Sequence, residues 1–226
     1  MAYFKKEEDI RPLFESQLEL CGVDYFDFYL MHAQSAEIFK HFKACRAYET
    51  AFELKKEGKI RHVGISFHDR AEVLDEILRE YPQIEVVQIQ LNYVDFDDPA
   101  VQSRKCYEVC RKHGKPVIVM EPVKGGSPAS YAIRFAAGFP GILMVLSGMS
   151  NIQQMKDNIS FMQNFQPLTD AEMEAVRKVQ DIFRFMHRIA CTACRCCTDG
   201  CPQHLPIREL LEQVAAELKK KEEPKT

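Results

Sequence analysis

The sequence predicts an α/β fold on a parallel sheet, specifically a partial (β/α)8 barrel of the TIM type with about five β/α units. Five short, mostly continuous apolar runs recur along the chain, which is typical of strands buried on both faces of a parallel sheet. Amphipathic helical segments separate these runs, so each strand–helix–strand step reads as a crossover unit. No GxGxxG motif follows any run, which favours a barrel over a doubly wound dinucleotide-binding sheet.

The first part of the chain supplies one helix and two strands. Residues 7–22 have helical periodicity and precede the first apolar run, 25–33. A second run, 60–67, follows Gly58, a residue type that commonly ends helices because it accepts left-handed backbone. Asp69 is followed three residues later by a glutamate, which is capping-box spacing and predicts a helix start there.

Three more strands and the helices between them follow. Asp98 precedes a proline, as Ser127 does, and both pairs predict helix starts because proline is tolerated in a first turn. Gly114 lies where the helix before the fourth strand would end. The three predicted strands cover residues 84–93, 115–123 and 141–149.

The C-terminal part reads as helical. Ser150 and Thr169 each precede a glutamine or glutamate by three residues, which predicts two further helix starts. One helix is expected over 170–188, and another over 207–220, where the apolar residues fall on one face.

Composition excludes several function classes. The formal net charge is -3, so no basic excess recruits nucleic acid, and no apolar run approaches the length of a membrane span. The first residues lack the apolar core of a secretion signal, so we expect a cytoplasmic protein. Thiols stay reduced there, which makes a cysteine-rich stretch a candidate metal or redox site rather than a disulfide framework.

Such a stretch occurs near the C-terminus, where cysteines follow the spacing CxxCxxCxxxCP. This is the ferredoxin run, whose short gaps let one loop aim several thiolates at an iron–sulfur cubane. A zinc site with four cysteine ligands is the alternative. Cys196 breaks the spacing and is a bystander. Cys106 or Cys110, four residues apart on one helix face, could supply a remote ligand, and the commoner explanation for both is a small buried core cysteine. The predicted ligands of the 4Fe–4S cluster are Cys191, Cys194, Cys197 and Cys201.

Five stretches, in this order, resemble strands four to eight of an aldo/keto reductase barrel. They are "GVDYFDFYLMHA", "GKIRHVGISFHD", "VVQIQLNYVD", "KPVIVMEPVKGG" and "MVLSGMSNIQQMKDNI". The C-terminal cysteines resemble those of the subgroup that carries a 4Fe–4S module. We therefore expect a partial aldo/keto-reductase-like barrel over 1–165, a C-terminal helical 4Fe–4S module over 166–220 and a disordered tail over 221–226.

The resemblance also implies site residues. Family members reduce carbonyls with NAD(P)H through an Asp, Tyr, Lys and His tetrad, and only the His has a counterpart here, His32. Met120 stands where the family often has a tyrosine that stacks on the nicotinamide. No arginine or lysine occupies positions 150 and 151 to pair with a 2'-phosphate, so the choice between NAD and NADP stays open. The implied cofactor-binding positions are Ser66 and Gln88 for the nicotinamide amide, and Ser147, Gly148, Met149, Ser150, Gln154 and Asn158 for the adenine-side phosphate.

Two functions follow as expectations. The first is an iron–sulfur oxidoreductase that resembles NAD(P)H-linked aldo/keto reductases, with little carbonyl reduction from this chain alone because Asp, Tyr and Lys of the tetrad have no counterpart. Hydride carries two electrons at once and a 4Fe–4S cluster takes one, so electron transfer between them needs a group such as a flavin that can handle both. A flavin is therefore a possible further cofactor, and a redox protein is a possible partner. The second is a non-catalytic, cluster-stabilised assembly protein that self-associates through an exposed sheet edge.

Overall fold

The computed structural model describes residues 4–123, 129–185, 195–199, 201, 203 and 205–222. The chain divides into two compact units. The first comprises Met1–Leu91, Asp95–Met120 and Phe139–Leu146, and the second comprises Asn92–Val94, Glu121–Gly138 and Ser147–Thr226.

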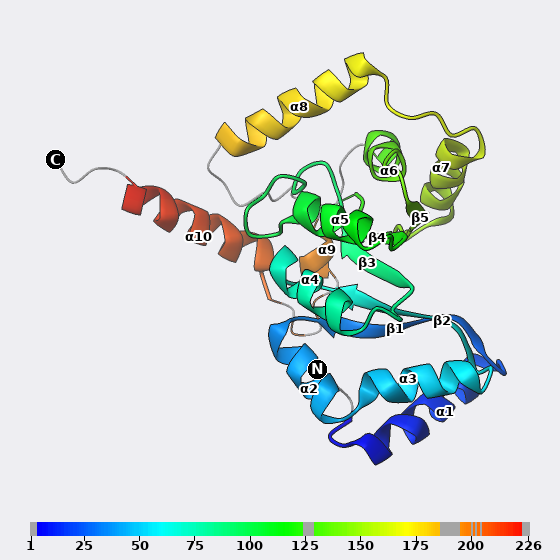
Figure 1. Ribbon diagram of the computed structural model, residues 1–226. Coiled ribbons are helices and arrows are strands. Elements are labelled where there is room, and N and C mark those ends of the chain that lie inside the picture. The colour runs from blue at the N-terminus through cyan, green and yellow to red at the C-terminus, as the bar shows by residue number, and fades with distance from the viewer. Residues whose placement is uncertain are drawn as a thin grey trace. The chain divides into compact units, whose positions relative to one another are not determined.

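The first unit is built on one parallel sheet with its strands in chain order, β1-β2-β3-β4-β5 (Figure 1). All five predicted strands and their parallel direction are confirmed. The third, fourth and fifth are shorter at both ends than predicted. The strands are β1 (Phe26–Gln34), β2 (Ile60–Phe67), β3 (Val86–Gln90), β4 (Val117–Met120) and β5 (Ile142–Val145).

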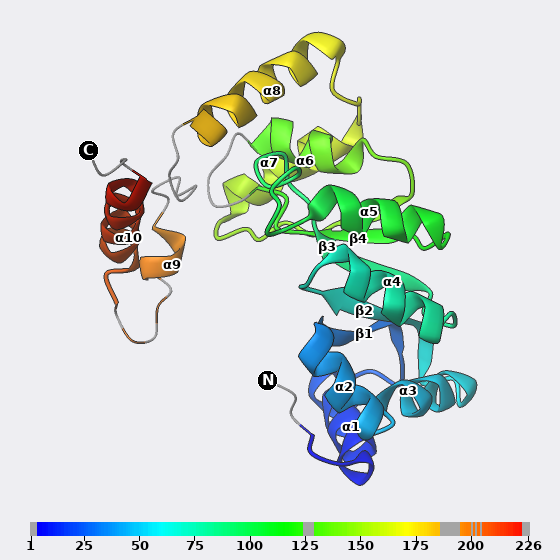
Figure 2. The ribbon, with the colours of Figure 1, turned by 60° about the vertical axis from the view of Figure 1, so that its left-hand side comes forward.

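The helices of the first unit connect these strands, and Figure 2 shows the strands following one another with α4 and α5 alongside. They are α1 (Ile10–Cys21), preceded by a short 3-10 turn, α2 (Ala36–Ala44), α3 (Ala47–Lys56), α4 (Ala71–Glu80) and α5 (Ser103–Lys112). Gly58 and Gly114 have φ of +80° and +65°, so the predicted glycine stops are confirmed.

The two faces of the sheet differ in burial. Alternate side chains such as Val63, Ile65, Val87 and Val119 are fully buried on one face. On the other face Phe28 and Met144 remain 37% and 44% exposed. The main core therefore lies on the helix-covered side of the sheet. The other side is exposed at its edge strands, and we call it the open face, although Val86 and Ile118 in its centre are buried, at 1% and 3% exposure.

In the first unit the helix start predicted at Asp98 is wrong, and α4 begins close to its predicted start but without the predicted cap. The Asp98 carboxylate accepts the N–H groups of Ala100 and Val101, which forms a turn, and α5 begins only at Ser103. Asp69 does not cap α4, because one of its oxygens accepts the Ala36 N–H, at 2.8 Å, from the segment after β1. Aspartate at these positions organises loops instead.

The second unit contains the remaining helices. They are α6 (Ala129–Ala137), α7 (Ile152–Gln163), α8 (Asp170–Phe185), α9 (Cys196–Asp199) and α10 (Ile207–Glu222). The predicted capping box of α8 is confirmed, since Thr169 and Glu172 exchange hydrogen bonds of 3.3 and 2.8 Å. The start of α7 is one residue later than predicted, because Asn151 caps it.

Arg134 joins α6 to the start of α8 within the second unit. Its guanidinium donates to both carboxylate oxygens of Glu172, at 2.7 and 2.9 Å, and to the carbonyls of Gln166 and Pro167. This bidentate pair fixes the segment that leads into α8. Among the described helices, none combines the length and the apolar composition that a membrane crossing requires.

Candidate functional site

Three of the predicted site residues lie within two residues of the carboxyl ends of neighbouring strands in the first unit. Ser66 on β2 is the register partner of Gln88 on β3. On β1, the backbone N–H of Ala33 donates to the Ser66 hydroxyl at 2.8 Å, which places His32 beside Ser66. Because side chains alternate along a strand, His32, Ser66 and Gln88 lie on the open face of the sheet, at the end where parallel barrels carry their chemistry. We call these three residues the strand-end row.

Exposure differs along the strand-end row. The His32 side chain is exposed, Gln88 is half-buried, and Ser66 is only 5% exposed. Met120 ends β4 further along and is buried at 9% exposure. The row thus offers an imidazole, a hydroxyl and a carboxamide to a molecule on the open face.

A buried hydrogen-bond network holds the end of β1. The sheet register shifts between Met31 and Gln34, where Ala33 takes a left-handed φ of +52°. The Gln34 side chain donates to the His32 carbonyl at 3.1 Å and accepts from the Tyr48 hydroxyl at 2.7 Å. Gln34 and Tyr48 are both 0% exposed, so these bonds fix the backbone of His32 from the covered side of the sheet.

Gly64 lies two residues before Ser66 on the same face of β2, where the Val86 and Leu30 side chains leave no room for a side chain. A Cβ there would lie 2.5 Å from a Val86 methyl and 2.6 Å from a Leu30 methyl, closer than atoms pack. Our sequence interpretation missed Gly64, Gln34 and Tyr48. A glycine inside a strand pattern was the available signal, because it marks close approach by neighbouring groups.

The other implied cofactor residues lie in the second unit, around the start of α7. Asn158 donates to the Ser147 hydroxyl at 3.1 Å, and the Gln154 side chain accepts the Ser150 N–H at 2.7 Å. A Cβ on Gly148 would meet nothing within 4 Å, and Met149 is 44% exposed. The backbone before α7 is therefore open to a group approaching the helix start, where N–H groups and the helix dipole favour anions.

The predicted cluster ligands are only partly described. Cys191 and Cys194 lie outside the described residues, and Cys197 and Cys201 carry free thiols. The Cys201 N–H donates to the carbonyl of Thr198, the residue after Cys197, at 3.2 Å. In the part of the chain that the structure describes, no three His, Cys, Asp or Glu side chains gather as a metal site would require. The four-cysteine site stays a prediction.

Cys106 and Cys110 are buried in α5, at 3% and 0% exposure. Burial raises the pKa of Cys106 to about 12 and raises the pKa of Cys110 as well. The Cys106 thiol lies 3.7 Å from the Asp69 carbonyl. Because a metal ligand is a thiolate, these surroundings suit core cysteines better than a remote ligand.

A model of the aldo/keto reductase family matches residues 2–127. The chain is similar to the NADH-specific methylglyoxal reductase of Escherichia coli (strain K12), with 30% identity over 119 residues, 53% of this chain and 34% of that protein. It is 29% identical to the glyoxal reductase of Bacillus subtilis (strain 168) over 113 residues, 50% of this chain and 37% of that protein. The matched segments thus span about a third of these curated relatives.

Solved structures show the same fold. The holo form of an aldo-keto reductase from Bacillus halodurans superposes with a TM-score of 0.60 at 21% identity, covering 78% of this chain and 68% of that one. An aldo-keto reductase from Klebsiella pneumoniae, in complex with NADPH, gives a TM-score of 0.61 at 18% identity, covering 78% and 66%. At these identities the likeness concerns the fold.

Proposed function

Because the chain belongs to the aldo/keto reductase family, we propose that it binds NAD(P)H as an oxidoreductase-type protein and holds a 4Fe–4S cluster in its C-terminal module. The observation that supports cofactor binding best is the strand-end row. Its hydroxyl and carboxamide lie next to each other on the open face of the sheet, at the carboxyl ends of β2 and β3.

The chemistry of the row fits a nicotinamide amide. The Gln88 side chain can donate one hydrogen bond to a carboxamide and accept one from it. The Ser66 hydroxyl accepts from the Ala33 N–H and still has its own proton to donate. Bound NAD(P)H supplies a hydride to an electrophilic carbon. His32 can orient a carbonyl oxygen by donating a hydrogen bond from its exposed ring.

The start of α7 fits a phosphate, because backbone N–H groups there can donate hydrogen bonds to its oxygens. Ser150 and Gln154 now satisfy each other, so a phosphate that takes the Ser150 N–H would displace the Gln154 side chain. The Gln154 amide nitrogen, which takes no part in the Ser150 bond, could then turn to donate to the phosphate. No arginine or lysine occurs at positions 150 and 151, and the choice between NAD and NADP stays open.

Carbonyl reduction by this chain alone should be slight. The sequence offers no counterpart of the family's Asp, Tyr and Lys, so no acid pair beside His32 can protonate a developing alkoxide. We expect negligible NADPH oxidation with a panel of aldehydes, measured by absorbance, and no further loss in His32→Ala. Aldehyde turnover that disappears in His32→Ala would contradict this expectation.

The cluster is tested by a matched pair of cysteine variants. Protein purified without oxygen should contain about four iron and four acid-labile sulfide per chain, since a cubane has that composition. Cys197→Ser should lose most of this iron, whereas its neighbour variant Cys196→Ser should keep it. A colourless protein that carries zinc, or equal iron in both variants, would refute the cluster.

The alternative is a non-catalytic assembly protein, and one observation favours it. In the sheet, β1 pairs with β2 alone, and Phe28 on β1 is 37% exposed. An open strand edge with an exposed aromatic side chain invites pairing with another copy. Light scattering that finds a stable dimer, broken by Phe28→Lys, would support this function; a monomer at all concentrations would exclude it.

A further inference from the structure

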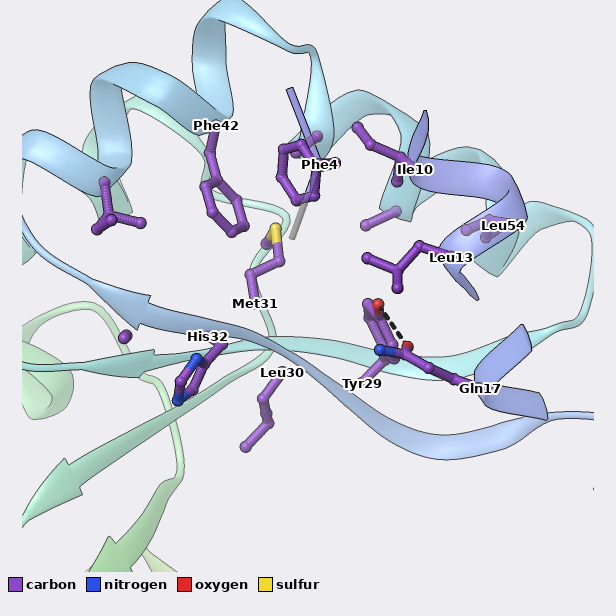
Figure 3. Close-up of a pocket in the computed structure, with 14 residues that line it drawn as sticks. Phe4, Ile10, Leu13, Gln17, Tyr29, Leu30, Met31, His32, Phe42 and Leu54 are labelled. Atoms are coloured by element: carbon purple, nitrogen blue, oxygen red, sulfur yellow. Dashed lines mark hydrogen bonds between the residues drawn. The ribbon is translucent and has the colours of Figure 1, made fainter. Parts of the chain in front are cut away.

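We propose that the first unit holds a second binding site, which takes a small, uncharged, apolar molecule with one oxygen. The site is a cavity on the covered side of β1, and it does not rest on the proposed function. Figure 3 shows that Met31 points into the cavity, whereas the neighbouring His32 points away from the other lining side chains. A ligand there would not compete with one at the strand-end row.

The cavity has a volume of about 250 Å³ and lies between β1 and the helices α1, α2 and α3. Its walls are aliphatic and aromatic, and none of the lining residues is a lysine, arginine, aspartate or glutamate. For comparison, an apolar cavity of about 150 Å³ in another protein stays dry and takes up benzene. This cavity therefore suits an uncharged molecule of one or two rings. The main wall residues are Phe4, Ile10, Leu13, Met31, Phe42 and Leu54 (Figure 3).

The wall formed by Phe4 is held in place, so the space is not simply a gap that the chain can close. The Phe4 ring packs against Phe42 and His41, with centroids 4.9 and 5.4 Å apart. The His41 ring donates to the Phe4 carbonyl at 3.0 Å, and the Cys45 thiol donates to the Lys5 carbonyl at 3.3 Å. These contacts fix the segment before α1 over the end of α2.

One polar pair gives the cavity its chemical preference. The Tyr29 hydroxyl donates to the Gln17 side-chain oxygen at 3.0 Å, at the wall formed by β1 and α1 (Figure 3). The Tyr29 bond uses the Gln17 amide oxygen, and the amide nitrogen makes no hydrogen bond with the described residues, so it remains available as a donor. A ligand oxygen that accepts from it would gain a contact that a hydrocarbon lacks.

Probe binding tests the proposal on the full chain. Toluene and phenol have nearly the same shape, and phenol carries a hydroxyl where toluene carries a methyl group. Benzoate adds a negative charge, and no lysine or arginine lines the cavity to match it. We expect toluene and phenol to raise the unfolding midpoint saturably, phenol with the tighter dissociation constant, and benzoate to have no effect. No saturable shift with either uncharged probe would overturn the proposal, as would benzoate that binds as tightly as phenol.

A matched pair of alanine variants tests the location. Ala51 on α3 is 3% exposed and lines the cavity, whereas Ala44 on α2 is exposed and does not. Ala51→Leu should fill the space, raise the midpoint of the unliganded protein and weaken both probes at least about tenfold, whereas Ala44→Leu should leave binding unchanged. If no space exists, Ala51→Leu overpacks the core and lowers the midpoint, which refutes the proposal.

Gln17→Met, made in a Tyr29→Phe background, tests the polar contact, because methionine keeps the size of the side chain and removes the amide. Tyr29→Phe is needed because the Tyr29 hydroxyl, once it loses Gln17 as its acceptor, could itself donate to phenol. We expect phenol to bind this variant no tighter than toluene, with toluene affinity kept. This readout is a ratio of two affinities, so a general loss of stability does not alter it. A preference for phenol that persists in this double variant would contradict the assigned role of Gln17.

Discussion

The hydrogen bond between Tyr48 and Gln34 offers the sharpest test of how the end of β1 is held. Both side chains are 0% exposed, and the bond is 2.7 Å long. Burial, together with the neighbouring Tyr81, raises the pKa of Tyr48 well above its usual value of 10, so the hydroxyl remains a neutral donor at all working pH values. Tyr48→Phe removes only the hydroxyl and keeps the ring that stacks on Tyr81, with centroids 4.1 Å apart.

The expected cost follows from what the substitution leaves behind. The Gln34 side-chain oxygen would stay buried without a donor, and an unsatisfied buried polar group costs about 1–3 kcal/mol. The ring contacts are unchanged, so no cavity cost is added beyond the missing oxygen. We therefore expect Tyr48→Phe to lower the free energy of unfolding by about 1–3 kcal/mol.

Urea unfolding followed by far-ultraviolet circular dichroism measures this change. Tyr107→Phe is the matched control, because its hydroxyl donates to the Pro140 carbonyl at 2.8 Å on the exposed surface and should cost less than about 0.5 kcal/mol. In the double variant Tyr48→Phe with Gln34→Leu, the second change should cost less than it does alone, because the orphaned oxygen is gone. Equal costs for Tyr48→Phe and Tyr107→Phe would refute the account of the network.

Three further predictions concern other parts of the chain. Gly64→Ala should lower the free energy of unfolding of the first unit, measured in urea, by about 1–3 kcal/mol, because its Cβ would lie 2.5 Å from a Val86 methyl. An unchanged urea midpoint would show that the neighbouring strands can move apart to accommodate the methyl group. Hydrogen bonds from Arg134 lower the pKa of Glu172 from 4.5 to about 2, so its stabilisation is complete above pH 4.5 and is lost as the pH falls toward 2. As the pH falls from 4.5 toward 2, the urea midpoint of Glu172→Gln should accordingly decrease less than that of the parent protein. Equal decreases for the two proteins would contradict a stabilising Arg134–Glu172 pair. Asn151→Ala should cost about 0.5–2 kcal/mol by uncapping α7, seen as faster amide exchange in its first turn, and unchanged exchange there would contradict the role of the cap.

The sheet was predictable because each of its strands can be recognised from its own local sequence. Each is a short apolar run, and residues such as Val63, Val87 and Val119 are fully buried as such runs require. The parallel order follows from the helices between them, because a crossover returns the chain to the same end of the sheet. The stops at Gly58 and Gly114 were also local, since left-handed backbone favours glycine.

Part of what failed depended on partners distant in the chain, whereas the turn at Asp98 is held by its neighbours Ala100 and Val101. Asp69 has capping-box spacing, yet its carboxylate is used by Ala36, 33 residues earlier. The strand-end row was named by family resemblance, but the network behind it was not, because Gln34 and Tyr48 look like an ordinary glutamine and tyrosine until α3 packs on β1. The apolar cavity was equally invisible, since apolar periodicity indicates which residues face inward and not how well they fill the space.

The central claim, that the strand-end row receives a nicotinamide amide, is tested most directly by titrating the protein with NADPH and following cofactor fluorescence. Gln88→Leu removes the carboxamide, and Gln83→Leu makes the same change on an exposed side chain before β3, at the opposite end of the strand. The account predicts saturable binding that Gln88→Leu weakens about tenfold or more, the equivalent of roughly 1.4 kcal/mol, and that Gln83→Leu leaves unchanged. Equal affinities for the parent and both variants, or no binding by the parent, would contradict it.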